Sequence, residues 1–352
     1  MIKQFIFIYL IVFCVCFSQA QVGGTNTYEF LNLPTSARIT ALGGKIASID
    51  ESDPAMVSMN PSLLNSSMDK SMSLNYTPYY AGINYGYVAY GSQIRDSSQM
   101  LLFGIQYANY GSFDESDSRG IITGKFSASD YVVNISYSRA IDSNLFLGAS
   151  VKPVYSDYTY YNSFGLLSDL GITYKSKDHL FVASVVLRNA GFQLWAYTPS
   201  GREPIPFEIL AGFSQKLKYA PLRFIVTFQQ LQRFDLSYQL LEENTAKIKG
   251  TETDNKSKIE NIATNALKHV ITGIEFVPSK NFFGSVSLNF KRRSELSIID
   301  KPGMVGFSYG FGVKIKKLRI TYGHSAFSLA GSYNVFSLNT VLSELYLNNK
   351  NK

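Results

Sequence analysis

The feature that most constrains this chain is a two-residue alternation of apolar with small or polar side chains, repeated from about residue 70 onward. It appears in residues 101–108, 131–138, 145–152, 222–229, 285–290 and 305–315. A period of two is typical of β-strands with two different faces. These segments reach about nine to eleven residues, enough to cross a membrane when tilted, whereas strands of soluble proteins usually have about five or six.

The two faces of the alternating segments suit two different surroundings. In the longest segment the apolar face runs from Val305 to Ile315, with glycine, serine and lysine between. Mixed aliphatic and aromatic residues suit lipid, while the opposite face suits a wet lumen. A soluble β-sandwich also alternates and is the competing interpretation. The 24 tyrosines, 25 phenylalanines and 26 glycines favour an all-β protein, a closed antiparallel transmembrane β-barrel.

The number of strands depends on three segments in which the alternation is weak. These segments are residues 70–76, 120–128 and 234–240. Counting them gives 14 to 16 strands, and the spacing of the long connections favours about 14. Tight connections at residues 278–281 and 316–317 predict periplasmic turns, while residues 242–266 and 292–303 predict outward loops.

Residues 1–20 have the pattern of a secretory signal peptide: an early lysine, an apolar run and Ser18-Gln19-Ala20. A single membrane helix is the alternative, but the run is shorter than the roughly 20 residues that a span needs. Cys14 and Cys16 lie inside this run and are the only cysteines, so the exported chain has no thiol for a disulfide or a metal. The net charge of +7 suits an anionic surface such as outer-membrane lipid or lipopolysaccharide better than nucleic acid.

Residues 38–64 break the strand pattern and predict a compact plug inside the barrel. Asp53 and Asn60 each precede a proline, so each can cap a short helical turn. A pair of glycines ahead of them allows a sharp bend. We therefore expect a signal peptide at 1–20, an N-terminal segment and plug at 21–69, and a barrel at 70–352. The residues expected to define the plug are Arg38, Gly43, Gly44, Asp53, Pro54, Asn60 and Pro61.

Motifs for catalysis or cofactor binding are weak. The three histidines, His179, His269 and His324, are far apart and lack metal-site spacing. Ser67 and Lys70 match a serine-enzyme motif of four residues, but its companion Lys-Thr-Gly is missing. Residues 120–125 lack the glycine spacing of a phosphate-binding loop. We therefore expect no enzyme activity, cofactor or metal.

Four tyrosines gather near the end of one predicted strand. Two interpretations are open: an aromatic girdle at the membrane interface, or a loop that grips a partner or a sugar. The four are Tyr155, Tyr158, Tyr160 and Tyr161.

Several motifs resemble the PorV/PorQ group of outer-membrane proteins. The likeness begins with Thr-Ser-Ala-Arg, Ala-Leu-Gly-Gly, Asp-Pro-Ala and Asn-Pro-Ser-Leu-Leu between residues 35 and 64. It extends to residues 23–38, 268–276, 291–296 and 306–312, and so covers most of the exported chain. The group in turn resembles FadL, a 14-stranded fatty-acid transporter with an N-terminal hatch.

The resemblance implies a subunit of the type IX secretion system, in an attachment complex with PorU, PorV and PorZ. That complex removes the C-terminal signal of secreted cargo and anchors the cargo to lipopolysaccharide. The FadL likeness implies a different function, an outer-membrane channel for the uptake of hydrophobic small molecules. These motifs concern packing and the barrel, so they leave both functions open.

Overall fold

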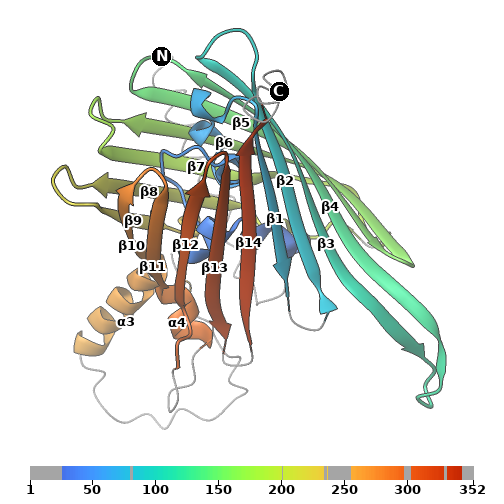
Figure 1. The fold of residues 1–352 in the computed structure, drawn as a ribbon. Helices are drawn as coiled ribbons and strands as arrows, with labels where there is room; N and C mark the ends of the chain where they lie inside the picture. Colours follow the sequence, from blue (N-terminus) through green and yellow to red (C-terminus); the bar gives the residue numbers. More distant parts are fainter. Residues whose placement is uncertain are drawn as a thin grey trace, which may run out of the picture.

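Fourteen antiparallel strands form a closed barrel in the computed structural model (Figure 1). The structure describes residues 26–79, 82–199, 201–233, 236, 255–296, 303–328 and 331–342. The strands are β1 (Ser71–Pro78), β2 (Asn84–Gln93), β3 (Gln99–Ser116), β4 (Ile122–Ala140), β5 (Leu145–Tyr158), β6 (Tyr161–Lys175), β7 (Phe181–Trp195), β8 (Glu208–Lys216), β9 (Leu222–Phe228), β10 (Val270–Ser279), β11 (Phe282–Asn289), β12 (Phe307–Ile315), β13 (Leu318–Ser328) and β14 (Gly331–Val341). The predicted fold class is confirmed.

Each strand pairs with its neighbours in sequence, and β1 closes the ring by pairing with β14 from Ser71↔Val341 to Tyr76↔Phe336. Closure leaves no unpaired edge in the bilayer, which is what a membrane-spanning sheet requires. Along β3, Phe103 and Ile105 are about half exposed, while Leu102 before them and Gln106 after them are buried. The outward face is therefore the apolar one, as the alternation predicts.

Two of the weak segments are strands, and one detail of the prediction is wrong. Residues 71–78 form β1, and residues 122–128 belong to β4. Residues 234–240 lie almost entirely outside the described part of the chain. Val305 was expected on the outward face, but β12 begins only at Phe307 and Val305 is buried in the turn before it. The positive φ of Gly306 bends the chain at that point and ends the alternation.

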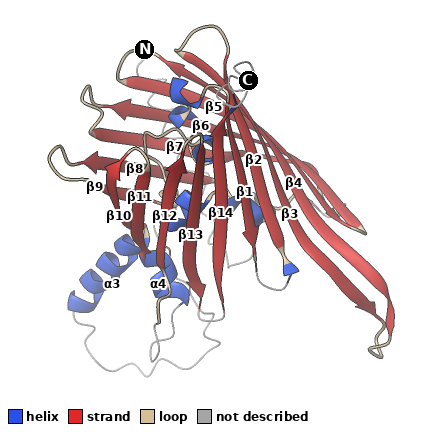
Figure 2. Ribbon diagram, viewed as in Figure 1, coloured by secondary structure: helices blue, strands red, loops and turns tan. Residues whose placement is uncertain are grey.

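The two ends of the barrel differ in the length of their connections. One end carries tight turns such as Lys316–Lys317, together with the start of β1 and the end of β14. The opposite end carries the hairpin of β3 and β4 and the helices α3 (Asn255–Lys268) and α4 (Phe290–Leu296), seen together at the bottom of Figure 2. Short turns mark the periplasmic end of outer-membrane barrels, so we name the two ends inner and outer accordingly.

The N-terminal segment lies within the ring of strands, in blue in Figure 1, and consists of short helical turns. These are η1 (Glu29–Asn32), α2 (Ala37–Ala41), η2 (Pro54–Ser58), η3 (Pro61–Leu63) and η4 (Ser66–Met68). Asp53 caps η2 by accepting from Ala55 N at 3.0 Å, and Asn60 caps η3 by accepting from Ser62 N at 3.0 Å. Among the described residues, no helix is long and apolar enough to cross a membrane.

The plug, rather than water, covers much of the inner wall. Small polar side chains of the wall, among them Ser136 and Ser150, are almost fully buried. A Cβ at Gly148 on β5 would lie 2.3 Å from Pro61, and one at Gly323 on β13 would lie 2.1 Å from the carbonyl oxygen of Ala37. The prediction of a wet lumen is therefore wrong along the plugged length, because the small inward residues make room for protein.

Candidate functional site

Buried ion pairs fix the plug to the inner half of the wall. The guanidinium of Arg38 donates Nε and Nη2 to the two carboxylate oxygens of Glu275 on β10, both at 2.9 Å. Arg223 on β9 donates to Glu275 and, at 2.8 Å, to Glu51 of the plug. Arg38 and Glu275 are 2% and 0% exposed, so neither charge has solvent to replace a lost partner.

Glu51 is the acidic centre of this network on the side of the plug. Burial by itself raises the pKa of its carboxyl, but the guanidinium groups of Arg38 and Arg223 outweigh burial and lower the pKa to about 2. Glu51 is therefore ionised at any physiological pH. Beside it, the carboxylate of Asp50 accepts a hydrogen bond at 2.7 Å from Lys175, at the end of β6.

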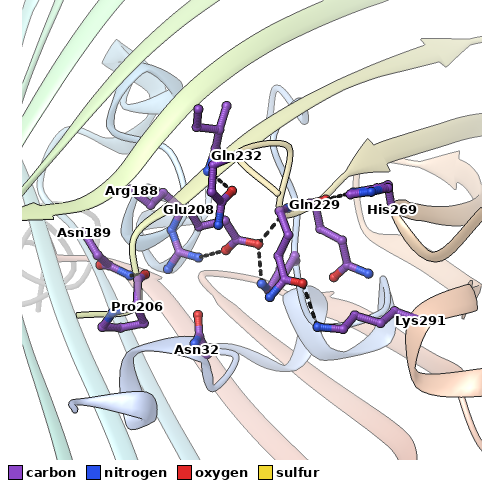
Figure 3. A network of polar contacts seen from close by, with 12 residues as sticks. Asn32, Arg188, Asn189, Pro206, Glu208, Gln229, Gln232, His269 and Lys291 are labelled. Atoms are coloured by element: carbon purple, nitrogen blue, oxygen red, sulfur yellow. Dashed lines mark hydrogen bonds and ion pairs between the residues drawn. The ribbon is translucent and has the colours of Figure 1, made fainter. Parts of the chain in front are cut away.

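A second network ties the plug to the outer half of the barrel (Figure 3). The carboxylate of Glu208 on β8 accepts hydrogen bonds from Lys45 of the plug at 2.5 Å and from Arg188 of β7 at 3.2 Å. Lys291 at the start of α4 donates to Gln230, whose backbone N–H donates to Glu208. The outer helix α4 is thus connected to the plug through shared hydrogen-bond partners.

Helix α4 also covers the bend of the plug. Gly43 and Gly44 have φ values of +89° and +91°, and a Cβ at Gly44 would lie 2.4 Å from the guanidinium of Arg292. The amide of Asn289, just before α4, donates to Gly43 O at 3.1 Å. Both glycines are therefore needed for the bend; Gly44 also allows the close approach of α4, and Gly43 that of Ile271 on β10.

An aromatic pocket of about 600 Å³ opens at the outer end, on the inward face of the long strands β3 to β6. We call it the outer pocket. Its walls are mostly apolar, and Phe113 stacks on Phe126 across the hairpin with ring centroids 5.1 Å apart. The residues lining it are Tyr110, Phe113, Glu115, Phe126, Ala128, Tyr158, Tyr160 and Tyr161.

A second pocket of about 460 Å³ shares Tyr110, Tyr158 and Tyr161 with the outer pocket and reaches the plug. Its polar centre is the buried carboxylate of Asp130, which accepts Tyr110 Oη at 2.6 Å and Tyr158 Oη at 3.2 Å. Below it, the plug residues Tyr28, Phe30 and Leu31 pack on inward apolar residues of the wall. The outer end of the lumen therefore has an apolar floor with a few fixed hydroxyl groups.

The structure separates the four tyrosines that the sequence grouped. Tyr158, Tyr160 and Tyr161 line the outer pocket, and Tyr160 donates to Glu115 at 3.0 Å. Tyr155 points the other way, onto the lipid-facing surface, where it stacks on Tyr131. Three of the four thus share one surface, and Tyr155 belongs to the outer wall.

The histidines and the serine motif do not meet at a site. His179 lies 3.6 Å from Asp50, His269 bonds Gln229 O, and His324 stacks on Tyr309. The hydroxyl of Ser67 donates to the capping Asn65, and Lys70 has a positive φ where β1 begins. No group of three His, Cys, Asp or Glu side chains among the described residues is placed to hold a metal.

Several residues of these sites were missed from the sequence. Glu208, Arg223 and Glu275 are charged residues at inward positions of otherwise alternating strands. That position was a usable signal, since an inward charge in a plugged barrel needs a partner. Tyr110 gave no such signal, because tyrosine is frequent throughout the chain.

Comparison with known proteins gives structural matches only. No protein-family model matches the chain, and no curated protein matches its sequence. Among solved structures, the toluene transporter TodX of Pseudomonas putida matches with a TM-score of 0.50 and 12% identity over 87% of this chain and 96% of TodX. A deltaS2S3 mutant of the TodX monoaromatic hydrocarbon channel matches with a TM-score of 0.50 and 14% identity, over 87% of this chain and 97% of the mutant. A FadL homologue of Pseudomonas aeruginosa matches with a TM-score of 0.46 and 10% identity, over 87% of this chain and 97% of the homologue.

At this identity the likeness concerns the fold. This chain is a closed ring of 14 antiparallel strands with an apolar outer face, which is the architecture of outer-membrane β-barrels. The chain is therefore a multi-pass outer-membrane β-barrel, and its fold is similar to that of TodX.

Proposed function

We propose that this barrel is a non-enzymatic outer-membrane protein that takes up hydrophobic small molecules through its outer pocket. The observation that carries the proposal is the outer pocket itself, an apolar and aromatic surface on the inward side of the wall. Stacked rings such as Phe113 and Phe126 suit flat apolar molecules. TodX, a toluene transporter of similar fold, makes an aromatic hydrocarbon a reasonable first ligand.

Passage beyond the outer pocket requires the plug to shift. Tyr28, Phe30 and Leu31 of the plug form the floor. The buried pairs of Arg38 and Lys45 hold the plug to the inner and outer halves of the wall. The outer pocket is therefore the capture site, and release depends on the plug.

The test is equilibrium binding of a fluorescent naphthylamine probe, and its displacement by toluene, with the barrel in lipid nanodiscs. We expect saturable binding that weakens about tenfold in Tyr158→Ala, since one aromatic contact contributes about 1–1.5 kcal/mol. Tyr155→Ala is the matched control, because it removes the same side chain from the lipid-facing surface. Equal binding by the two variants would refute the outer pocket as the capture site.

The second candidate is a subunit of the type IX attachment complex, most similar to PorQ. The observation that favours it is the connection of α4 to the plug through Lys291, Gln230 and Glu208, which gives the outer end a fixed surface suited to a partner. The motif likeness at residues 23–38 supports the same function. In this proposal the barrel is an anchor, and PorU, PorV and PorZ bind its outer end.

Purification in mild detergent separates the two candidates. The attachment function predicts that PorU, PorV and PorZ accompany the barrel, and that deletion of residues 242–265 stops secreted cargo from reaching the surface. The uptake function predicts a barrel that is purified alone and binds the probe saturably. Recovery of the barrel by itself, under conditions that preserve complexes of PorV, counts against the attachment function.

A further inference from the structure

A cavity of about 710 Å³ opens at the inner end of the barrel, between the tight turns and the plug. We call it the inner cavity. Seven lysine or arginine residues line it, against two acidic ones, Asp50 and Glu51 of the plug. Its volume is in the range of small-molecule sites, roughly 300–1,000 Å³. The outer pocket, by contrast, has a single charged lining residue, Glu115.

The acidic residues do not neutralise this cavity. Glu51 is held by Arg38 and Arg223, and Asp50 by Lys175. Lys216, Lys280 and Lys314 make no ion pair with any described residue, and Arg319 comes only to 3.9 Å of Glu51. Several cations therefore face the inner cavity with their charge uncompensated by the described part of the chain.

The strand register places like charges opposite each other at this cavity. Lys314 on β12 pairs directly with Arg319 on β13, and Lys216 on β8 pairs directly with Arg223 on β9. Like charges directly opposite in a sheet destabilise it. Lys280 lies in the turn between β10 and β11, which are the strands between these two pairs in the barrel. For Lys314 and Arg319 this arrangement is unfavourable without a ligand and becomes favourable when an anion lies between the cations. Arg223, in contrast, is already compensated by Glu275 and Glu51, so Lys216 is the cation of the second pair that no described residue compensates.

We propose that the inner cavity is a binding site for a multiply charged anion that carries phosphate or carboxylate groups and approaches from the periplasm. Lysine and arginine side chains on separate turns can each contact a different anionic group of such a ligand. The attraction comes from Lys216, Lys280, Lys314 and Arg319, and the plug forms the floor of the site. The inference is independent of the proposed function, because it concerns the opposite end of the lumen.

The test is isothermal titration calorimetry of the purified exported chain in a zwitterionic detergent, at low salt. The probes are inorganic triphosphate and a penta-glutamate peptide. We expect saturable binding of at least one probe, weakened about tenfold in Lys280→Gln/Lys314→Gln and weakened further by salt. Binding of only one probe shows whether the site prefers phosphate or carboxylate groups. Binding of both shows that the site recognises negative charge without distinguishing the two groups.

Matched variants keep the test decisive. Arg119→Gln/Lys125→Gln removes the same charge from the exposed hairpin at the outer end and should leave binding within about twofold. Lys216→Gln tests the other like-charge pair separately. All variants should give the β-sheet circular dichroism spectrum of the wild type, which shows that they are folded. No saturable binding of either probe, or an equal loss in the outer-end control, would overturn the proposal.

Discussion

The two ends of the lumen have opposite chemistry although the same strands build both. At the inner end, Arg38, Glu51, Arg223 and Glu275 form a buried ionic network beneath a cationic cavity. At the outer end, Tyr28 and its neighbours form an apolar layer beneath an aromatic pocket. The plug therefore separates a charged compartment from an apolar one.

This difference shows how the plug is held. Apolar packing is non-directional and roughly proportional to area, so the apolar layer around Tyr28 fixes position only loosely, and the ion pair between plug and wall in the outer half is that of Lys45 with Glu208. The bidentate bonds between Arg38 and Glu275 fix both distance and orientation. We infer that the inner end determines where the plug sits. The following predictions test that inference, from the largest expected effect to the smallest.

The largest effect is expected for Arg38→Met. The substitution leaves Glu275, which has no solvent exposure, with Arg223 as its remaining cationic partner. Breaking a buried pair costs about 3–5 kcal/mol. We expect a lower midpoint of unfolding in guanidinium and a raised conductance in planar bilayers as the plug loosens. Arg119→Met, at an exposed pair in the hairpin, is the control; an equal change in both variants would contradict the inference.

Acidification should produce the next largest effect. The pKa of Glu51 is lowered to about 2 in the folded barrel, so its stabilisation is fully present above about pH 4.5 and is lost as the pH falls toward 2. The expected loss is on the order of 3 kcal/mol. The Glu51→Gln variant should be less stable than the wild type at pH 6. Its free energy of unfolding should also change less between pH 5 and pH 2. A variant with the same pH profile as the wild type would show that Glu51 does not hold the plug.

An intermediate effect is expected for Gly323→Ala on β13. Its Cβ would lie 2.1 Å from the carbonyl oxygen of Ala37, so α2 must move, at a cost of about 2 kcal/mol. Gly284→Ala is a matched control, because the nearest atom to its Cβ is 4.0 Å away. Increased protease cleavage within the plug in Gly323→Ala alone is the expected result. Equal resistance of the two variants would show that the plug adapts without strain.

The smallest effect is expected at the outer end, for Tyr28→Phe. It removes the 2.5 Å hydrogen bond to Ser163 but keeps the ring, so the free energy of unfolding should fall by only about 1 kcal/mol. Guanidinium unfolding of Tyr28→Phe and Arg38→Met under the same conditions compares the two losses in free energy of unfolding. A loss at Tyr28 as large as that at Arg38 would reverse the roles of the two ends.

Much of the fold was predictable because its signals are local. The two-residue period gives the face of each residue within a strand, and the long connections set the strand count near 14. The caps at Asp53 and Asn60 were predictable because a cap, its proline and the backbone N–H that donates to the cap lie within three residues. Val305 was misplaced because alternation continues through a turn whose bend depends on Gly306.

The sites were less predictable, because the strand pattern marks a residue as inward but does not indicate which part of the plug it contacts. The inward faces were expected to be small and polar, which argued against an apolar path. At the outer end, however, Ala108, Val132, Val154 and Leu167 face inward and pack against the plug. The sequence of a strand does not give the height of each residue along the barrel axis. That height determines whether an inward residue lies near Arg38 or near Tyr28 of the plug.

By itself, the sequence determined that each strand has one face for lipid and one for the interior, and that a compact segment precedes the strands. Only the tertiary structure decided the contents of the interior. Arg38 and Glu275 are 237 positions apart, and β1 meets β14 only when the ring closes. Such partners depend on strand register and closure across the whole barrel, which no local pattern of side chains specifies.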